Sequence, residues 1–168
     1  GLGMSPKRIP LSTAGISKMI HRMGDEKVKF RLALSLHAAN DEKRSQIMPI
    51  NEQNSLESLI TAMNHFYHAT GNRVTYEYII FKDFNDSIED ADELASFIQK
   101  APGRVNIIEY NPIDDGEFEQ ASPEKVDAFA AHLERKNVIV NIRRSRGKDI
   151  DAACGQLANK NEIATSAA

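Results

Sequence analysis

The segment Val74-Thr-Tyr-Glu-Tyr-Ile-Ile-Phe81 is a strong strand signal. Its β-branched and aromatic residues favour an extended strand. The helical pattern before it would end at Gly71, and the next one would begin after Ser87, a good N-cap residue. A strand that lies between two helices indicates a parallel sheet, because parallel strands need a long crossover connection that is usually helical.

The same alternation of strand and helix extends in both directions from this segment. The other expected strands are Ile9–Thr13, Phe30–His37, Val105–Tyr110 and Val138–Arg144. The expected helices are Ile16–Met23, which stops at Gly24, a short helix from Asp41 to Met48, a longer one that begins near Asn54 or Ser55, and two that begin after Ser87 and Ser122. We therefore predict an α/β fold of five mostly parallel strands with intervening helices. Residues 1–160 would form one domain core, and residues 161–168 a flexible tail.

The composition excludes several classes of protein. The chain has 168 residues, of which 41% are hydrophobic and 27% charged, as in ordinary globular domains. No apolar run approaches the roughly 20 residues that a membrane-spanning helix needs. Cys154 is the only cysteine, which excludes an internal disulfide or a three-cysteine metal site and suits a reducing, cytoplasmic location. The formal net charge of -3 means that any nucleic-acid contact must come from a local basic patch.

Functional residues are expected where the strands end, since ligands of parallel α/β folds gather at the carboxyl ends of the strands. In Phe30–His37 the large apolar residues share one face, which helices would cover, and the smaller or polar residues share the other. Ser35 and His37 lie at the carboxyl end of the polar face, where they suit a bound ligand. The alternative for His37 is a structural role, in which it caps the strand and bonds a loop carbonyl.

Two further strand ends are polar. Ser12 lies near the end of the first strand, just before a helix begins, so hydroxyl and backbone N–H groups could hold an oxygen-rich ligand there. Asn111 follows the fourth strand, and its amide could bind an adenine edge or a carboxylate. For both residues the alternative is local structure: an ordinary helix start at Ser12 and an Asn-Pro turn at Asn111.

A basic run stands out toward the C-terminal end of this net acidic chain. Its four cations are Arg143, Arg144, Arg146 and Lys148. They could bind RNA phosphates and bases, or they could belong to a solvated loop. Cys154 follows closely and could be a reactive thiol or an inert buried one. The acidic loop Asp83–Ser87 lacks the glycine and the glutamate of a calcium-binding loop, so we expect no metal site in this chain.

This C-terminal segment resembles the signature of a known enzyme family. Asp149-Ile-Asp-Ala-Ala-Cys-Gly-Gln-Leu157, preceded by Arg143-Arg-Ser-Arg-Gly-Lys148, is similar to the corresponding stretch of the RlmN family of radical-SAM RNA adenine-C2 methyltransferases. Further segments match in the same order: Leu11-Ser-Thr-Ala-Gly-Ile16, Leu34-Ser-Leu-His-Ala38, Ile47-Met-Pro-Ile-Asn51, Val74-Thr-Tyr-Glu-Tyr78, Asn85-Asp-Ser87 and Val105-Asn-Ile-Ile-Glu-Tyr-Asn-Pro112. The related Cfr methyltransferases share much of this set, but the arginine-rich stretch is closer to RlmN.

The resemblance implies a fold, cofactors and residue roles. It implies the C-terminal portion of a partial (β/α) barrel, S-adenosylmethionine (SAM) as a cofactor, and a [4Fe–4S] cluster in the full-length parent. By motif match, the methyl-carrying residue is Cys154, and the positions that contact SAM are Ser12, Ser35, Leu36, His37 and Asn111. The implied substrate is an adenine of 23S ribosomal RNA, with transfer RNA as a second expected substrate.

The sequence departs from the family in one respect. Its single cysteine cannot supply the CxxxCxxC cluster motif, which lies upstream in the family. We therefore expect a fragment or truncated product of a longer enzyme, inactive by itself. The alternative is a non-catalytic α/β module that binds RNA or a nucleotide, and the sequence directly upstream would distinguish the two. The first strand would also present an open edge, which invites pairing between two chains.

Overall fold

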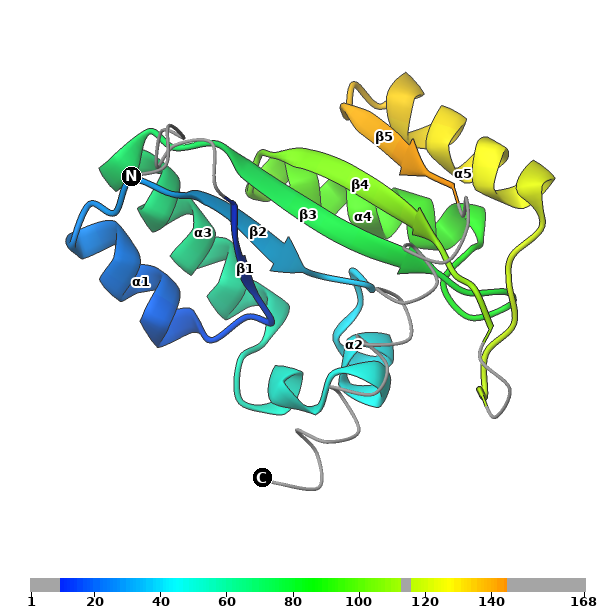
Figure 1. The fold of residues 1–168 in the computed structure, drawn as a ribbon, viewed down its shortest axis with the longest axis horizontal. Coiled ribbons are helices and arrows are strands. Elements are labelled where there is room, and N and C mark those ends of the chain that lie inside the picture. The colour runs from blue at the N-terminus through cyan, green and yellow to red at the C-terminus, as the bar shows by residue number, and fades with distance from the viewer. Residues whose placement is uncertain (1–9, 113–115, 145–168) are drawn as a thin grey trace, which may run out of the picture.

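The computed structural model describes residues 10–112 and 116–144 (Figure 1). Its strands are β1 (Pro10–Thr13), β2 (Arg31–Ser35), β3 (Val74–Ile80), β4 (Arg104–Glu109) and β5 (Val140–Arg143). Its helices are α1 (Ser17–Asp25), α2 (Asp41–Ile47), the 3-10 helix η2 (Pro49–Glu52), α3 (Leu56–Thr70), α4 (Ile88–Lys100) and α5 (Pro123–Arg135). The predicted residues Arg146, Lys148 and Cys154 lie outside the described residues, as does the predicted tail.

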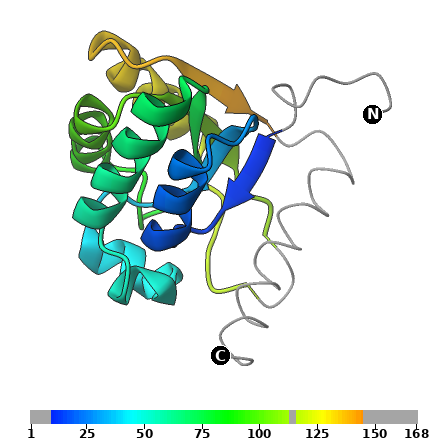
Figure 2. The ribbon, with the colours of Figure 1, turned by 90° about the vertical axis from the view of Figure 1, so that its left-hand side faces the viewer.

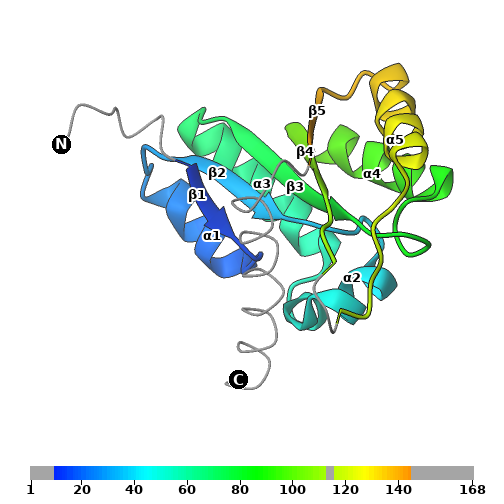
Figure 3. The same cartoon turned by 45° about the vertical axis from the view of Figure 1, so that its right-hand side comes forward.

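The five strands form one sheet in the order β1-β2-β3-β4-β5, and every neighbouring pair is parallel. Crossovers between parallel strands are right-handed, so a strand order without a reversal puts every connecting helix on the same face. The described helices accordingly lie on one side of the sheet (Figure 2). The strands also turn progressively from β1 to β5 (Figure 3), as in other twisted parallel sheets. The predicted α/β fold is confirmed.

The main core lies between the sheet and these helices. The apolar wall predicted for the second strand is confirmed, since Leu32, Leu34 and Leu36 are buried in this core. Two tyrosines of β3 share it, and their hydroxyl groups are satisfied by backbone carbonyls. Tyr76 donates to the carbonyl of Ala101 at 2.8 Å, and Tyr78 donates to that of Asn85 at 2.6 Å.

The opposite face of the sheet is mostly polar, although Ile79 and Ile108 lie on it toward the carboxyl ends of β3 and β4. One row across four strands, set by the pairing register, consists of Ser35, Glu77, Asn106 and Asn141. Within the described residues, no helix covers this face (Figure 2). A sheet that is apolar toward its helices and mostly polar on the other side resembles part of the wall of a (β/α) barrel, whose lumen would lie on that other side.

Helix ends follow the local sequence signals. The side chains of Ser55, Ser87 and Ser122 each accept a hydrogen bond from a backbone N–H of the first helical turn. Gly71 ends α3 with a φ of 68°, a left-handed conformation that glycine adopts without strain. Pro123 occupies the first position of α5, where its missing N–H costs nothing.

Gly24 does not end its helix, because α1 continues to Asp25. Gly24 is buried where α1 packs against α3, and a Cβ atom added there would lie 2.8 Å from Cδ2 of His65. This glycine therefore allows close approach of two helices rather than providing a stop signal. On α3, Tyr67 is 48% exposed, whereas its neighbour Phe66 is buried.

The third strand ends one residue earlier than predicted, at Ile80, and two others are three residues shorter than predicted. The second strand ends at Ser35, because His37 takes a positive φ of 60° and leaves the extended conformation. The last strand begins at Val140 rather than at residue 138. Phe30, predicted on the apolar wall, is 37% exposed.

The first strand lies at an edge of the described sheet and pairs with β2. Three of its four residues are exposed. The self-association expected through this edge stays a prediction. Among the described helices, none combines the length and the apolar character that a membrane span requires.

Candidate functional site

The carboxyl ends of the strands meet at one edge of the sheet, beside α2 (Figures 1 and 3). Each predicted ligand residue that the structure describes lies at or near this edge. Ser12 is on β1, Ser35 closes β2, His37 follows β2, and Asn111 follows β4. The sequence pattern therefore located this edge correctly, although the roles of these residues are not tested by their position.

His37 is held rigidly between β2 and β3. Its backbone N–H donates to the carbonyl of Glu77 at 3.2 Å, and its Nδ1 accepts from the N–H of Ile79 at 3.0 Å. The residue is 3% exposed, so both contacts are shielded from water. The left-handed backbone and these bonds fix the direction of the imidazole ring. His37 therefore does bond a neighbouring strand, but through a backbone N–H rather than a loop carbonyl.

The second nitrogen of this ring points to a functional use. Because Nδ1 accepts a hydrogen bond, the neutral ring carries its proton on Nε2. Burial, and secondarily the nearby charge of Arg44, lower the pKa of His37 to about 3, so the ring is neutral at physiological pH. Nε2 is buried and has no hydrogen-bond partner among the described residues. An unpaired buried donor costs about 1–3 kcal/mol, a cost that a ligand acceptor would remove.

Asn85 joins the ends of β2 and β3 and was not identified as a site residue from the sequence. Its amide Nδ2 donates to the carbonyls of His37 at 2.7 Å and Ile79 at 2.9 Å. Its Oδ1 accepts from the N–H of Phe81 at 2.7 Å. Asn85 is fully buried, so no water could replace these bonds. It holds the carbonyl of His37, while the carbonyl of Glu77 accepts from the N–H of His37.

Ser12, Ser35 and Leu36 differ in how far their side chains are exposed. Ser12 is exposed on β1, and Ser35 is partly buried on the polar face of β2. The side chain of Leu36 is 0% exposed and belongs to the main core. Its N–H donates to the carbonyl of Glu77, and its own carbonyl accepts from Arg44. These two bonds fix the backbone of Leu36 between its two polar neighbours.

Asn111 is anchored by a second, aromatic core. Phe81, Tyr110 and Phe118 pack there, with ring centroids 4.9 Å apart for Phe81 and Tyr110 and 4.3 Å apart for Phe81 and Phe118. This packing ties the segment after β4 to the end of β3. Nδ2 of Asn111 is buried without a hydrogen-bond partner among the described residues. It is thus a second amide or ring N–H donor available to a ligand at this edge.

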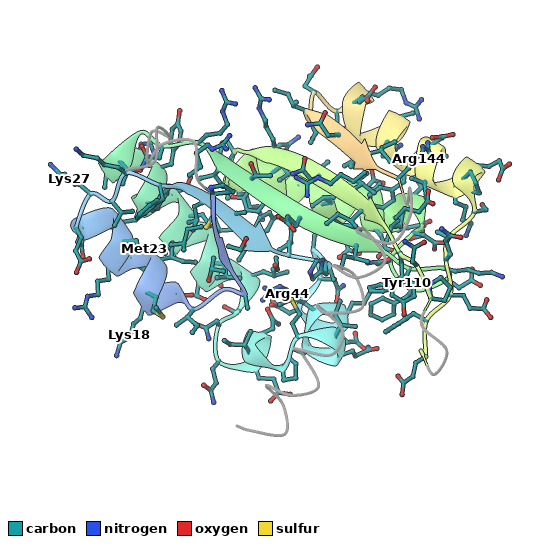
Figure 4. The ribbon with its side chains drawn as sticks, in the orientation of Figure 1. Lys18, Met23, Lys27, Arg44, Tyr110 and Arg144 are labelled. Atoms are coloured by element: carbon teal, nitrogen blue, oxygen red, sulfur yellow. The ribbon has the colours of Figure 1, made fainter. Side chains whose placement is uncertain are left out.

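The two described members of the basic run lie at and just beyond the end of β5. Arg144, labelled in Figure 4, is paired with two carboxylates, Glu109 at 3.4 Å and Asp127. Arg143 is exposed, and no ion pair within the described ranges reaches it. The run is therefore not one uniform cationic surface: Arg143 is directed to solvent, and Arg144 ties β5 to its neighbours.

A shallow cavity lies at the other end of the sheet. Its volume is about 520 Å³, and its lining includes Val74, Gly103, Arg104 and Ile139. These residues come from the amino ends of β3, β4 and β5. The cavity is therefore separate from the buried unpaired donors of His37 and Asn111, which lie at the carboxyl ends.

Comparison with known proteins gives a consistent result. No protein-family model matches the sequence. The chain is 56% identical over 160 residues to a "Probable dual-specificity RNA methyltransferase RlmN" of Flavobacterium psychrophilum, covering 95% of the chain and 46% of that relative. It is 60% identical over 160 residues to the same-named protein of Cytophaga hutchinsonii, covering 95% of the chain and 44% of the relative. The chain thus spans about half the length of the curated relatives it matches.

A solved structure shares the fold. The crystal structure of a radical SAM methyltransferase from Sphaerobacter thermophilus superposes with a TM-score of 0.86 at 38% identity, over 93% of this chain and 46% of that one. A domain of a pyruvate-formate lyase-activating enzyme from Bacteroides vulgatus matches with a TM-score of 0.55 at 10% identity and supports the fold alone. The resemblance to the RlmN family is confirmed over nearly the whole chain, as is the partial-barrel fold.

Proposed function

We propose that this chain is part of a radical-SAM RNA methyltransferase that methylates C2 of adenine. The observation that carries the proposal is the identity of 56% over 95% of the chain with an RlmN protein. The site supports it independently. Two buried donors without partners, on His37 and Asn111, lie at the strand ends where parallel α/β folds bind ligands.

SAM fits the donors of this edge. Its carboxylate, ribose hydroxyls and adenine nitrogens are acceptors, and the edge offers N–H groups from His37 and Asn111 with hydroxyl groups from Ser12 and Ser35. SAM carries a positively charged sulfonium. The neutral ring of His37 suits such a ligand, because a protonated ring would repel the sulfonium. When bound, SAM would supply a methyl group and, in cluster chemistry, a radical. The residues of this chain would bind and orient it.

An iron–sulfur cluster does not fit the residues of this chain. Such clusters are held by several cysteine thiolates, and the sequence has Cys154 alone. Cluster ligands would have to come from outside this sequence, in the longer protein that its relatives' length suggests. Cys154 itself, outside the described residues, is proposed as the carrier of the methyl group, because a thiolate is the side chain best suited to accept one.

The proposed substrates are an adenine of 23S ribosomal RNA and, as a second substrate, transfer RNA, acted on in the cytoplasm. The relatives' printed name, dual-specificity RNA methyltransferase, supports an RNA substrate. Arg143, with Arg146 and Lys148 outside the described residues, could contribute phosphate contacts.

The test compares the longer protein with this chain. After anaerobic reconstitution with iron and sulfide, each is incubated with SAM, a reductant and a 23S RNA fragment, and digested nucleosides are analysed by mass spectrometry. We expect 2-methyladenosine from the longer protein and none from this chain, since one thiol cannot hold the cluster. A longer protein that holds a cluster and cleaves SAM, yet leaves every adenine unmodified, would refute the function. A non-catalytic module would neither bind the cluster nor cleave SAM.

A further inference from the structure

Arg44 is a fully buried cation at the carboxyl edge of the sheet. It belongs to α2 and is 0% exposed, and it lies beside the end of β1 (Figure 4). Its Nε donates to the carbonyl of Leu36 at 3.0 Å, and its Nη1 to Oδ1 of Asn51 at 3.1 Å. Its Nη2 donates to the carbonyls of Ala14 at 2.7 Å and Ser35 at 2.9 Å. Each nitrogen of the guanidinium group is thus used.

Two of these hydrogen bonds lie where the backbone pairing between β1 and β2 ends. The β1–β2 ladder runs from Pro10↔Arg31 to Thr13↔Leu34, so the next pair in register would be Ala14 and Ser35. Nη2 of Arg44 bonds the carbonyls of this pair. A side chain therefore links the two strands at the point where backbone pairing stops, and it sets how far their ends stand apart.

The surroundings are shaped to admit this guanidinium group. Gly15 has a φ of 108°, and a Cβ atom added there would lie 3.2 Å from Nη2 of Arg44. Asn51, which accepts from Nη1, is itself fixed by its own donation to Asp41 and Ser45. Within the described residues, no carboxylate forms an ion pair with Arg44, so its partners are neutral oxygens. Burying a guanidinium group among neutral oxygens costs more desolvation free energy than burying apolar side chains. This cost indicates that Arg44 has a role beyond filling the core.

We propose that Arg44 is a positioning residue: it clamps the ends of β1 and β2 so that Ser12, Ser35 and His37 stand at the spacing that SAM requires. The clamp also takes up the carbonyls of Ala14, Ser35 and Leu36, which would otherwise compete for the donors that face the ligand. This inference rests on the proposed function, because it assumes that the strand ends bind SAM.

The test uses this chain and three variants. Arg44→Lys keeps the positive charge, but its single ammonium nitrogen cannot replace the three guanidinium nitrogens that bond Leu36, Asn51 and the Ala14–Ser35 pair. Arg44→Ala leaves a space that added methylguanidinium can fill. Leu94→Ala is the matched control, because Leu94 is 0% exposed in the core on α4 and its loss destabilises the fold without touching the clamp. Binding of S-adenosylhomocysteine is measured by calorimetry, and amide exchange by NMR.

We expect Arg44→Lys and Arg44→Ala to weaken binding at least about tenfold, with methylguanidinium restoring most of the loss in Arg44→Ala. Exchange should accelerate at Leu36 and His37 more than at Val105, which lies on β4. Leu94→Ala should accelerate exchange generally and keep its affinity. The clamp is refuted if Arg44→Lys matches the wild type in both measurements, or if Leu94→Ala loses as much affinity. If the wild-type chain did not bind S-adenosylhomocysteine, the proposed SAM site would be contradicted. The amide-exchange pattern alone would then test whether Arg44 clamps the two strands.

Discussion

Replacing Cys154 with alanine in the longer protein is expected to abolish RNA methylation. The proposed role of Cys154 is to accept a methyl group on its sulfur, and alanine offers no nucleophile. Loss of a covalent nucleophile lowers enzymatic rates on the order of 10⁴- to 10⁶-fold. The measurement is the yield of 2-methyladenosine by mass spectrometry, which should fall below detection in the variant. In the wild type, the peptide that contains Cys154 should carry a methyl group.

The cluster and SAM binding should survive this change, because Cys154 is assigned to methyl transfer and not to metal ligation or folding. Asn159→Ala is the matched control: it alters a nearby polar residue outside the matched Asp149–Leu157 segment and should retain activity. A structural cysteine would show the opposite pattern, with lower stability through a small cavity but an active surviving enzyme. If Cys154→Ala methylated RNA at a near wild-type rate, the covalent role assigned to Cys154 would be wrong.

Acid should destabilise this chain through His37 by an unusually large amount. The pKa of His37 is lowered by burial to about 3, whereas an unfolded histidine titrates near 6.5. Between these values the unfolded chain binds a proton that the folded chain does not, so stability falls as the pH falls. From pH 7 to pH 4 this loss amounts to about 3 kcal/mol of the free energy of unfolding.

The measurement is urea unfolding of the wild type and of His37→Asn at both pH values. Asparagine tolerates the left-handed backbone at this position and does not titrate. The stability advantage of the wild type over His37→Asn should shrink by about 3 kcal/mol between pH 7 and pH 4. An advantage of the wild type over His37→Asn that is equal at both pH values would mean that His37 is not held neutral in the fold.

Much of the fold was predictable because its signals are local. Serine caps, the Gly71 stop and the β-branched strand at 74–80 act over a few residues, and the structure confirms them. Gly24 shows the limit of this reasoning. As a sequence signal it indicates a helix end, but its actual role depends on His65 of another helix, a contact that no local pattern contains.

The residues of the candidate site also fall into those that the sequence predicted and those that it did not. Alternation along the second strand placed Ser35 and His37 at a polar strand end, and the chain direction of parallel strands placed Asn111 at the same edge. Arg44 and Asn85 were missed, because their partners lie far along the chain: Arg44 bonds Ala14, 30 residues away, and Asn85 bonds His37, 48 residues away. The roles of Arg44 and Asn85 depend on tertiary contacts. From sequence alone, both residue types are ordinarily expected at the surface.

SAM is proposed to bind at the carboxyl ends of β1, β2 and β4. NMR titration of the isotope-labelled chain with S-adenosylhomocysteine tests this binding site, because each amide reports its own position. We expect chemical-shift changes to concentrate at Ser12, Ser35, the ring and backbone of His37, and the side-chain amide of Asn111. Shifts that instead cluster around Val74, Gly103 and Ile139, at the cavity on the amino ends of the strands, or no shifts at all, would contradict it.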